Sequence, residues 1–417
     1  MMHPGSLNRR SVFVWTAAGN PRGPEKEDPL TQTAPATDAS ATLYFGPWYR
    51  KSPFFESTLA AGCSAYDIYN HMYLPGYYDD PVKEYWALLN DVTVWDVGVE
   101  RVVEISGPDG FELTNMITCR DLTKCAVGQG KYVLITAPDG GIVNDPVLLR
   151  RDENTFWLCL ADGDTHLYAL GLAEGKGLNA TVTLPEVYPV QVQGKKSKEV
   201  MTKLVGPEIL DVKYYWTLDA DINGIPVVIS RTGWTGEVGY EVYLTDPTRG
   251  ADLWNTILDA GREHDIRPVA PVEARRIEAG IFNYNSDMTL DNNPFEVMGL
   301  ERLVEQQEAD YVGKAALERI RKDGVSRKLV GIEVPGDPLP FELSEFRPAL
   351  HGGKQVGKIT DLIWSPRLEK NIGYVWVPIE LATPGNEIEI LWQGGEKTKG
   401  QTADIPFLDP TKRVPAT

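Results

Sequence analysis

The sequence predicts an α+β protein with a separate β-rich region at its C-terminal end. Amphipathic helical segments alternate with β-rich segments that are separated by turn signals, which is typical of helices interleaved with antiparallel strands. From "RKLVGIEV" onward, starting at residue 327, the pattern is β with Gly and Pro turns. These two observations favour an α+β fold over a doubly wound parallel sheet.

We expect three regions along the chain. Residues 1–43 are rich in Pro, Thr, Ala and acidic side chains and carry little apolar periodicity, so they are predicted to be a disordered extension. Residues 44–325 are predicted to form two interleaved α+β domains. Residues 326–417 are predicted to form the C-terminal β domain and its tail.

The first half of the chain contains a recurring local unit. "DDPVKEYWALLNDV" (79–92) indicates a capped amphipathic helix. A strand, a glycine and a helix then follow one another at 101–118, and the same order returns at 188–206, which indicates a weak internal duplication. Between them, 130–164 holds three β-rich segments separated by "APDGG" and "RDEN", which predicts an antiparallel meander.

The second half contains a predicted hairpin around a glycine-rich loop. "GIPVVIS" (224–230) and "GYEVYL" (239–244) flank "RTGWTGEV" (231–238). Glycine weakens a strand interior, so a loop with this many glycines is expected to position a side chain, and Trp234 and Glu237 are the candidates. Helices are predicted over 248–265, 271–281 and 311–324.

Composition excludes several classes of protein. The 417 residues carry a net charge of −18, which argues against a nucleic-acid binder. No apolar run is long enough for a membrane span. The four cysteines and five histidines lack metal-ligand spacing, and scattered cysteines are typical of free thiols in a reducing cytoplasm. The chain has no dinucleotide, P-loop or G-x-S-x-G motif. The sequence leaves open whether the protein is a homodimer.

Four segments in order carry a family resemblance. They are "GQGKYVLITAPDGGIVNDPVLL" (128–149), "RTGWTGEVGYEVYL" (231–244), "RRIEAGIFNYNSDMTLDNNPFE" (275–296) and "GKITDLIWSPRLEKNIGYVWV" (357–377). Together they resemble the aminomethyltransferase family, which includes the T-protein of the glycine cleavage system. The resemblance implies a three-domain cloverleaf around a central channel that binds tetrahydrofolate.

One branch of that family is closer. "SPFFESTLAAGCSAYDIYNHMYLP" (52–75), "VWDVGVER" (94–101), "MITCRDLTK" (116–124) and "VNDPVLL" (143–149) resemble dimethylsulfoniopropionate demethylases. The chain departs from that branch at Gly236 and Glu237, where it keeps the T-protein's T-G-E-x-G. It also has Trp234 where the T-protein has Tyr. The loop therefore combines features of both branches. This bears on the prediction of the methyl donor more than on the prediction of folate binding.

The resemblance also implies site residues. Asp145 matches the catalytic aspartate of the family. Glu237 matches the carboxylate that accepts two hydrogen bonds from the pterin, and Arg276 matches the arginine for the folate glutamate tail. Tyr132 and Trp364 are expected to line the channel. The family implies no metal.

Four aromatic side chains match the donor-binding positions of the demethylase branch, and we expect them to form the substrate site. An aromatic face attracts a sulfonium or quaternary ammonium by ~0.5–2 kcal/mol. A sulfonium leaves as a neutral thioether and needs no general acid, so orientation of donor and acceptor would carry most of the catalysis. The four are Phe54, Tyr66, Trp234 and Tyr240.

The function implied by the resemblance is a tetrahydrofolate-dependent demethylase acting on a sulfonium such as dimethylsulfoniopropionate, or on a related methylated donor. Three alternatives stay open. An aminomethyltransferase of the glycine cleavage type would need a docking surface for an acidic lipoyl carrier protein. An O-demethylase would need an acid for its alkoxide or phenoxide leaving group. A folate-binding protein without turnover is the third, and the presence of Asp145, Glu237 and Arg276 together argues against it.

Overall fold

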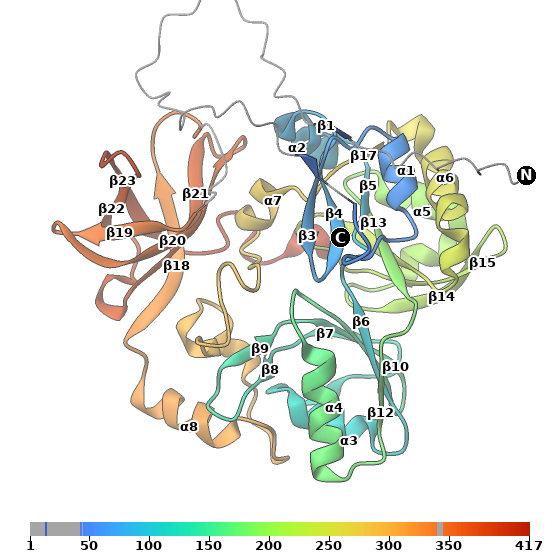
Figure 1. Ribbon diagram of the computed structural model, residues 1–417, viewed down its shortest axis with the longest axis horizontal. Helices are drawn as coiled ribbons and strands as arrows, with labels where there is room; N and C mark the ends of the chain where they lie inside the picture. The colour runs from blue at the N-terminus through green and yellow to red at the C-terminus, as the bar shows by residue number, and fades with distance from the viewer. Residues whose placement is uncertain (1–12, 15–41, 44, 340–344) are drawn as a thin grey trace, which may run out of the picture. The chain divides into compact units, whose positions relative to one another are not determined.

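The computed structural model describes residues 13–14, 42–43, 45–339 and 345–417 (Figure 1). The chain divides into two compact units, Met1–Arg50 and Lys51–Thr417. In the first unit, β1 (Phe13–Val14) pairs antiparallel with β2 (Thr42–Leu43). The remainder of the extension predicted to be disordered, 1–43, lies outside the described residues.

A five-stranded sheet forms the first part of the second unit, in the order β12-β6-β11-β10-β7. Its β7, β10 and β11 pair antiparallel, which confirms the predicted meander. Helix α3 packs against β6, β11 and α4. The elements are β6 (Val102–Ser106), β7 (Gly130–Tyr132), β10 (Val147–Asp152), β11 (Thr155–Cys159), β12 (Thr181–Thr183), α3 (Gly110–Ile117) and α4 (Thr165–Lys176).

A six-stranded sheet follows, in the order β14-β15-β16-β13-β5-β17. Its β15 and β16 form the predicted hairpin, and α5 and α6 pack against each other beside it (Figure 1). The elements are β5 (Thr93–Asp96), β13 (Tyr188–Gln193), β14 (Thr217–Ile222), β15 (Ile225–Ser230), β16 (Gly239–Leu244), β17 (Arg267–Pro268), α5 (Ser197–Val205) and α6 (Gly250–Gly261). The two similar strand–glycine–helix units begin in different sheets, because β6 belongs to the five-stranded sheet and β13 to the six-stranded sheet.

The C-terminal region forms a closed six-stranded barrel, in the order β18-β21-β20-β19-β22-β23. Closure removes the exposed sheet edges that an open β domain would leave. This confirms the predicted C-terminal β fold. The strands are β18 (Arg327–Val334), β19 (Arg347–His351), β20 (Lys354–Ser365), β21 (Lys370–Pro378), β22 (Glu387–Leu391) and β23 (Lys397–Ala403).

Shorter elements connect the sheets. Asp80 caps α2 by accepting from the backbone N–H groups of Val82 and Lys83, as the predicted capped helix requires. The structure adds the β3–β4 hairpin and α4, which the sequence pattern did not predict; α4 contains two glycines, which weaken the helical signal. These elements are α1 (Phe55–Ala60), α2 (Pro81–Asn90), α7 (Glu273–Glu278), α8 (Lys314–Asp323), α9 (Arg413–Ala416), β3 (Ala65–Tyr69), β4 (Met72–Tyr77), β8 (Ile135–Thr136) and β9 (Ile142–Asn144).

Two apolar clusters join the sheets to one another. Trp157 of the five-stranded sheet contacts Tyr243 of the six-stranded sheet, with ring centroids 6.0 Å apart and the rings tilted. A second cluster brings Cys119 and Leu134 together with Tyr374 of the barrel. These shared cores hold the three sheets against the segments that carry the candidate site.

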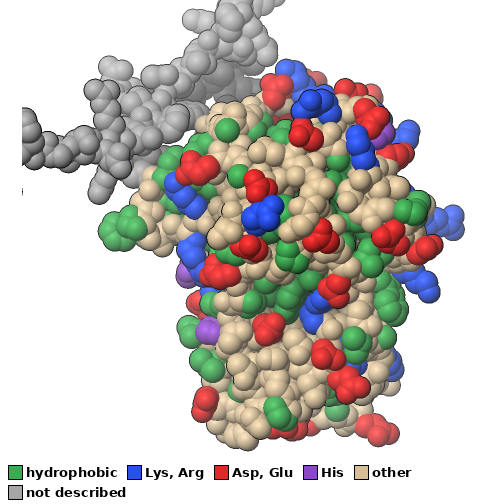
Figure 2. Space-filling model, turned by 90° about the vertical axis from the view of Figure 1, so that its right-hand side faces the viewer, with side chains coloured by type: hydrophobic (Ala, Val, Ile, Leu, Met, Phe, Trp, Pro, Cys, Tyr) green, Lys and Arg blue, Asp and Glu red, His purple; other side chains and the backbone are tan. Residues whose placement is uncertain are grey.

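The surface of the molecule is of mixed charge. On the face shown in Figure 2, acidic and basic side chains are interspersed. In the part of the chain that the structure describes, no helix combines the length and the apolar character needed to cross a membrane. The four cysteines are buried and unpaired thiols.

Candidate active site

A buried Asp–Tyr pair lies at the edge of the five-stranded sheet. Strand pairing sets Tyr132 opposite Val147, which brings Tyr132 close to the turn that carries Asp145. The Tyr132 hydroxyl donates to Asp145 Oδ2 at 2.9 Å. Asp145 Oδ1 is buried and has no hydrogen-bond partner among the described residues. An unsatisfied buried carboxylate oxygen is costly, so it marks a position prepared for a ligand.

Burial changes the protonation of Asp145. Desolvation raises its pKa to about 7 and outweighs the Tyr132 hydrogen bond, which lowers the pKa. The charge of Asp287 adds a smaller rise. The pKa of Tyr69 is raised first by burial and then by the charge of Asp145. Asp145 therefore acts electrostatically on Tyr69, which lines the cavity described next.

A cavity of about 200 Å³ lies where the β3–β4 hairpin meets the five-stranded and the six-stranded sheets. We call it the acidic cavity, because its charged lining residues are carboxylates. Tyr69, Trp95 and Trp234 contribute aromatic side chains to its wall. The carboxylates are Asp67, Glu100 and Glu273. Aromatic rings and carboxylates together favour a cationic ligand over an anion.

The glycine-rich loop 231–238 places Trp234 in that wall. Gly233 and Gly239 both lie against the buried Gln193 side chain, where an added Cβ would come within 2.3 Å and 2.5 Å of it. Gln193 is itself held, because it donates to the Thr232 carbonyl at 3.0 Å and accepts from the Thr235 hydroxyl at 3.0 Å. The glycines therefore permit a close approach that fixes the loop.

Glu237, in the same loop, forms a buried ion pair. Its Oε1 accepts from Arg275 Nε at 2.7 Å and lies 3.8 Å from the Arg367 guanidinium. Arg275 and Arg367 also contact the fully buried Glu278 at 3.4 Å and 2.8 Å. Arg275, the neighbour of Arg276 in α7, is thus the partner of Glu237. The pterin-binding role of Glu237 stays a prediction.

Arg276 is buried and surrounded by carboxylates. It donates to Glu273 at 2.5 Å, to Asp287 at 3.1 Å and to Asp361. Its guanidinium also lies 5.3 Å from the centre of the Trp234 ring. Arg276 contacts both the Trp234 ring and Asp361 of the barrel strand β20, so it connects the Trp234 loop to the barrel. Its role toward a folate tail stays a prediction.

A second cavity lies on the other side of the loop. Gly233 lines it, while the next residue, Trp234, lines the acidic cavity. Tyr132, Arg302 and Lys412 are among its lining residues, and no Asp or Glu of the described chain is, so we call it the basic cavity. Burial, and then the charge of Arg302, lower the pKa of Lys412. No ion pair in the described chain engages either cation.

The remaining expected aromatic residues are dispersed. Tyr66 lines a wider cavity of about 460 Å³ beside Arg276 and Asp361, and its hydroxyl lies 2.6 Å from that of Thr58. Phe54 and Tyr240 are 0% exposed in the core of the six-stranded sheet and line none of these three cavities. Trp364 lies in β20 opposite Asn371, half-buried, and does not line them either.

The structure adds residues that sequence reasoning missed. Tyr69, Trp95 and Glu100 line the acidic cavity. They lie in segments that resemble the demethylase branch, but no role for these three residues was predicted. "AYDIYNH" and "VWDVGVE" carry the signal, since each places an aromatic residue close to a carboxylate. Trp95 and Glu100 lie five residues apart on a strand and the turn after it, so no periodic pattern pairs them.

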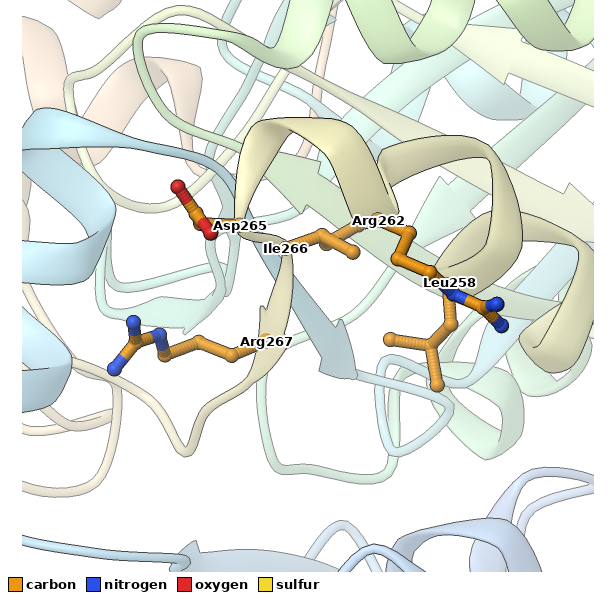
Figure 3. A pocket seen from close by; sticks show the side chains of 5 residues that line it. All are labelled: Leu258, Arg262, Asp265, Ile266 and Arg267. Atoms are coloured by element: carbon orange, nitrogen blue, oxygen red, sulfur yellow. The ribbon is translucent and has the colours of Figure 1, made fainter.

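A further pocket is not part of the site. Figure 3 shows a hollow at the end of α6, lined by Leu258, Arg262, Asp265, Ile266 and Arg267. Its three charged side chains point in different directions and do not converge on a common point. It has the form of a surface depression.

The comparisons with known proteins follow the same division of the chain. The GCVT N-terminal domain family matches residues 54–308, and the glycine cleavage T-protein C-terminal barrel domain family matches residues 327–409. The aminomethyltransferase T of the glycine cleavage system from Bartonella henselae is similar in structure, with a TM-score of 0.76 at 21% identity, over 86% of this chain and 98% of that one. This confirms the α+β fold class.

Similar sequences come from both branches of the family. The dimethylsulfoniopropionate demethylase DmdA of Ruegeria pomeroyi is 34% identical over 84% of this chain and 95% of its own. The aminomethyltransferase of Symbiobacterium thermophilum is 30% identical over 86% of this chain and 97% of its own. These matches confirm the expectation of a tetrahydrofolate-dependent transferase. The chain belongs to the aminomethyltransferase family, whose N-terminal GCVT domain and C-terminal barrel domain it contains.

Proposed function

We propose that the protein is a tetrahydrofolate-dependent demethylase that takes a methyl group from a sulfonium or a related methylated cation, of the class to which dimethylsulfoniopropionate belongs. The observation that carries the proposal is the pairing of two unlike cavities. The acidic cavity is built of aromatic rings and carboxylates, and the basic cavity of tyrosines, Arg302 and Lys412. Tyr132 lines the basic cavity and donates to Asp145, whose charge acts on Tyr69 of the acidic cavity.

The residues around Tyr132 fit tetrahydrofolate. Asp145 Oδ1 is buried and unpartnered, as a carboxylate prepared to accept a hydrogen bond from a ligand would be. Arg302 and Lys412, which no described carboxylate pairs, suit an anionic glutamate tail better than the saturated Arg276. Glu237 is proposed for the pterin ring, within the Arg275 network. Tetrahydrofolate supplies an amine nitrogen as the methyl acceptor.

The residues of the donor side orient a cation. Trp234 is fixed by its glycine loop and by Arg276, so its ring is held in one position. In a sulfonium the C–S bond breaks with its electron pair going to sulfur, and the leaving group is neutral. No proton donor is then needed at the acidic cavity. Asp145 would offset positive charge on the acceptor side and take up the proton released there.

An aminomethyltransferase of the glycine cleavage type is the second candidate. The T-G-E-x-G sequence of the loop and the 30% identical relative favour it. It differs from the demethylase in the carbon it transfers, because it would make 5,10-methylenetetrahydrofolate, whereas a demethylase makes 5-methyltetrahydrofolate.

The test is incubation with tetrahydrofolate and a donor panel of dimethylsulfoniopropionate, glycine betaine, vanillate and an aminomethyl lipoyl carrier. We expect 5-methyltetrahydrofolate from the sulfonium or ammonium donors. Vanillate as the best donor would indicate an O-demethylase. Formation of 5,10-methylenetetrahydrofolate from the carrier alone would establish the second candidate in place of the first.

A further inference from the structure

The charges of the acidic cavity are unbalanced. Asp67, Glu100 and Glu273 line it, and none of its lining residues in the described chain is Lys, Arg or His. The nearby Arg276 guanidinium is already shared among three carboxylates. A ligand in this cavity therefore meets negative charge that the protein itself does not neutralise.

Of the three carboxyls, Glu100 is the one for which the described chain provides no hydrogen-bond or ion-pair partner. Glu273 pairs with Arg276 at 2.5 Å, and the exposed Asp67 accepts from the Ile68 N–H at 2.6 Å. Glu100 lies half-buried in the turn after β5, and no hydrogen bond or ion pair engages its carboxylate in the described chain. Burial, and then the neighbouring Glu241, raise the pKa of Glu100. Glu241 is satisfied by Gln191, Thr232 and Tyr243.

We propose that Glu100 is the counter-ion of the methyl donor, and that the donor enters the acidic cavity as a net cation without a carboxylate of its own. The inference rests on the proposed demethylase function and narrows its substrate class. Simple methylated sulfonium or ammonium ions are the expected donors. Zwitterions such as dimethylsulfoniopropionate and glycine betaine are expected to bind more weakly.

The chemistry of such cations explains the arrangement. A methylated sulfonium or ammonium has no N–H or O–H to donate, so it is recognised by diffuse attraction to ring faces and to a nearby carboxylate. Tyr69, Trp95 and Trp234 supply the rings and Glu100 the charge. A zwitterion would bring its own carboxylate toward Asp67 and Glu273, where like charges repel.

The first experiment compares choline with 3,3-dimethyl-1-butanol, which has the same shape without the charge. Binding is followed by calorimetry, or by the fluorescence of Trp95 and Trp234. We expect choline to bind at least about tenfold more tightly than the neutral compound, because a desolvated cation gains from both the rings and the carboxylate. In Glu100→Gln this preference should fall several-fold, to the part that the aromatic rings supply. The matched control is Glu112→Gln, an exposed carboxylate of α3, which should keep it.

The second experiment needs no variant, so it holds even where Glu100→Gln does not fold. Choline and glycine betaine differ by a carboxylate, and the wild-type protein should bind choline more tightly. Tighter binding of glycine betaine, or an equal preference for choline in wild type and Glu100→Gln, would overturn the inference.

The demethylase function and the Glu100 cation site can be refuted independently of each other. Formation of 5-methyltetrahydrofolate with the zwitterions as the best donors would keep the demethylase and remove this inference. Choline binding that depends on Glu100, without methyl transfer from any donor, would keep the cation site and remove the demethylase.

Discussion

Asp145 combines two features at the scale of a single residue. Its Oδ2 is held by Tyr132, while its Oδ1 is buried without a protein partner. Its pKa of about 7 lies near neutral pH, so a small change in surroundings changes its charge. A carboxylate in this state can hold a proton or offset a positive charge.

We predict that Asp145→Asn lowers kcat by about 10- to 1,000-fold, since it removes the charge that would stabilise the transition state. The wild-type kcat should rise as the pH passes through about 7, where Asp145 ionises, and the variant should lack this rise. Steady-state rates measured from pH 5.5 to 8.5 provide the check. A pH profile shared by both proteins would exclude Asp145 as the ionising group.

Stability should respond to pH in the opposite direction, which separates catalysis from folding. The folded-state pKa of Asp145 is raised, so the folded protein keeps a proton that the unfolded chain releases. The contribution of Asp145 to the free energy of unfolding is therefore lost as pH rises from about 4 to about 7. Denaturant midpoints of wild type and Asp145→Asn across this range measure it.

Arg302 and Lys412 give a second prediction at this scale. Arg302→Met and Lys412→Met should each weaken polyglutamylated folate by about 10- to 100-fold and a tail-less pterin hardly at all, because a charge-assisted contact is worth ~1.5–3 kcal/mol. Calorimetry with both ligands is the measurement. Equal losses for both ligands would place the tail elsewhere. Arg276 is unsuitable for this test, because its removal strands Asp287 and Glu273.

The family resemblance pointed to Asp145 and Trp234 as site residues, but it could not predict which side chains surround them. Trp234 lines the acidic cavity, and Asp145 acts on Tyr69 of the same wall. The pairing of Glu237 with Arg275 depends on how α7 meets the loop, which no local pattern encodes. Phe54 is a core residue because α6 covers it, with Trp254 at 6.1 Å.

At the scale of elements, the hairpin β15–β16 and its loop form one rigid unit. The strands were predictable, because alternating apolar residues and glycine turns mark them. The β3–β4 hairpin was not, since "AYDIYN" and "MYLPGY" are short and a proline interrupts the second strand. That hairpin supplies Asp67, Tyr69 and Leu74 to the acidic cavity, so part of the cavity wall depends on an element that the pattern did not show.

We predict that Gly233→Ala lowers the free energy of unfolding by about 1–3 kcal/mol, because the new Cβ would overlap a Gln193 side chain that two hydrogen bonds hold. It should also raise the donor KM by displacing Trp234. The control is Gly171→Ala in α4, where a Cβ meets nothing within 4 Å. Urea denaturation compares the two, and equal stability of both variants would show that the loop is not fixed by Gln193.

At the scale of the whole molecule, the chain divides into two compact units. Met1–Arg50 and Lys51–Thr417 are distinct compact units, and all residues of the three cavities lie in the second. The barrel and the two open sheets share apolar clusters, so they are expected to unfold together. The closed barrel could be predicted only as a β region, because barrel closure depends on long-range pairing.

Deletion of residues 2–43 should therefore leave the melting temperature within about two degrees and the donor kcat/KM nearly unchanged, because the segment has too little apolar periodicity to join a core. Calorimetric melting and steady-state assays of the full and shortened chains measure both quantities. A larger fall in melting temperature would show that the extension packs on the second unit.

The most direct test of the demethylase account follows the transferred methyl group itself. The protein is incubated for a single turnover with tetrahydrofolate and a sulfonium donor whose S-methyl groups carry deuterium, with trimethylsulfonium and dimethylsulfoniopropionate compared side by side. Mass spectrometry of the folate product then counts the deuterium atoms. The account predicts 5-methyltetrahydrofolate with all three deuteriums retained, and a loss of product in Asp145→Asn. Unlabelled folate with both sulfonium donors, or label found only in 5,10-methylenetetrahydrofolate, would contradict it.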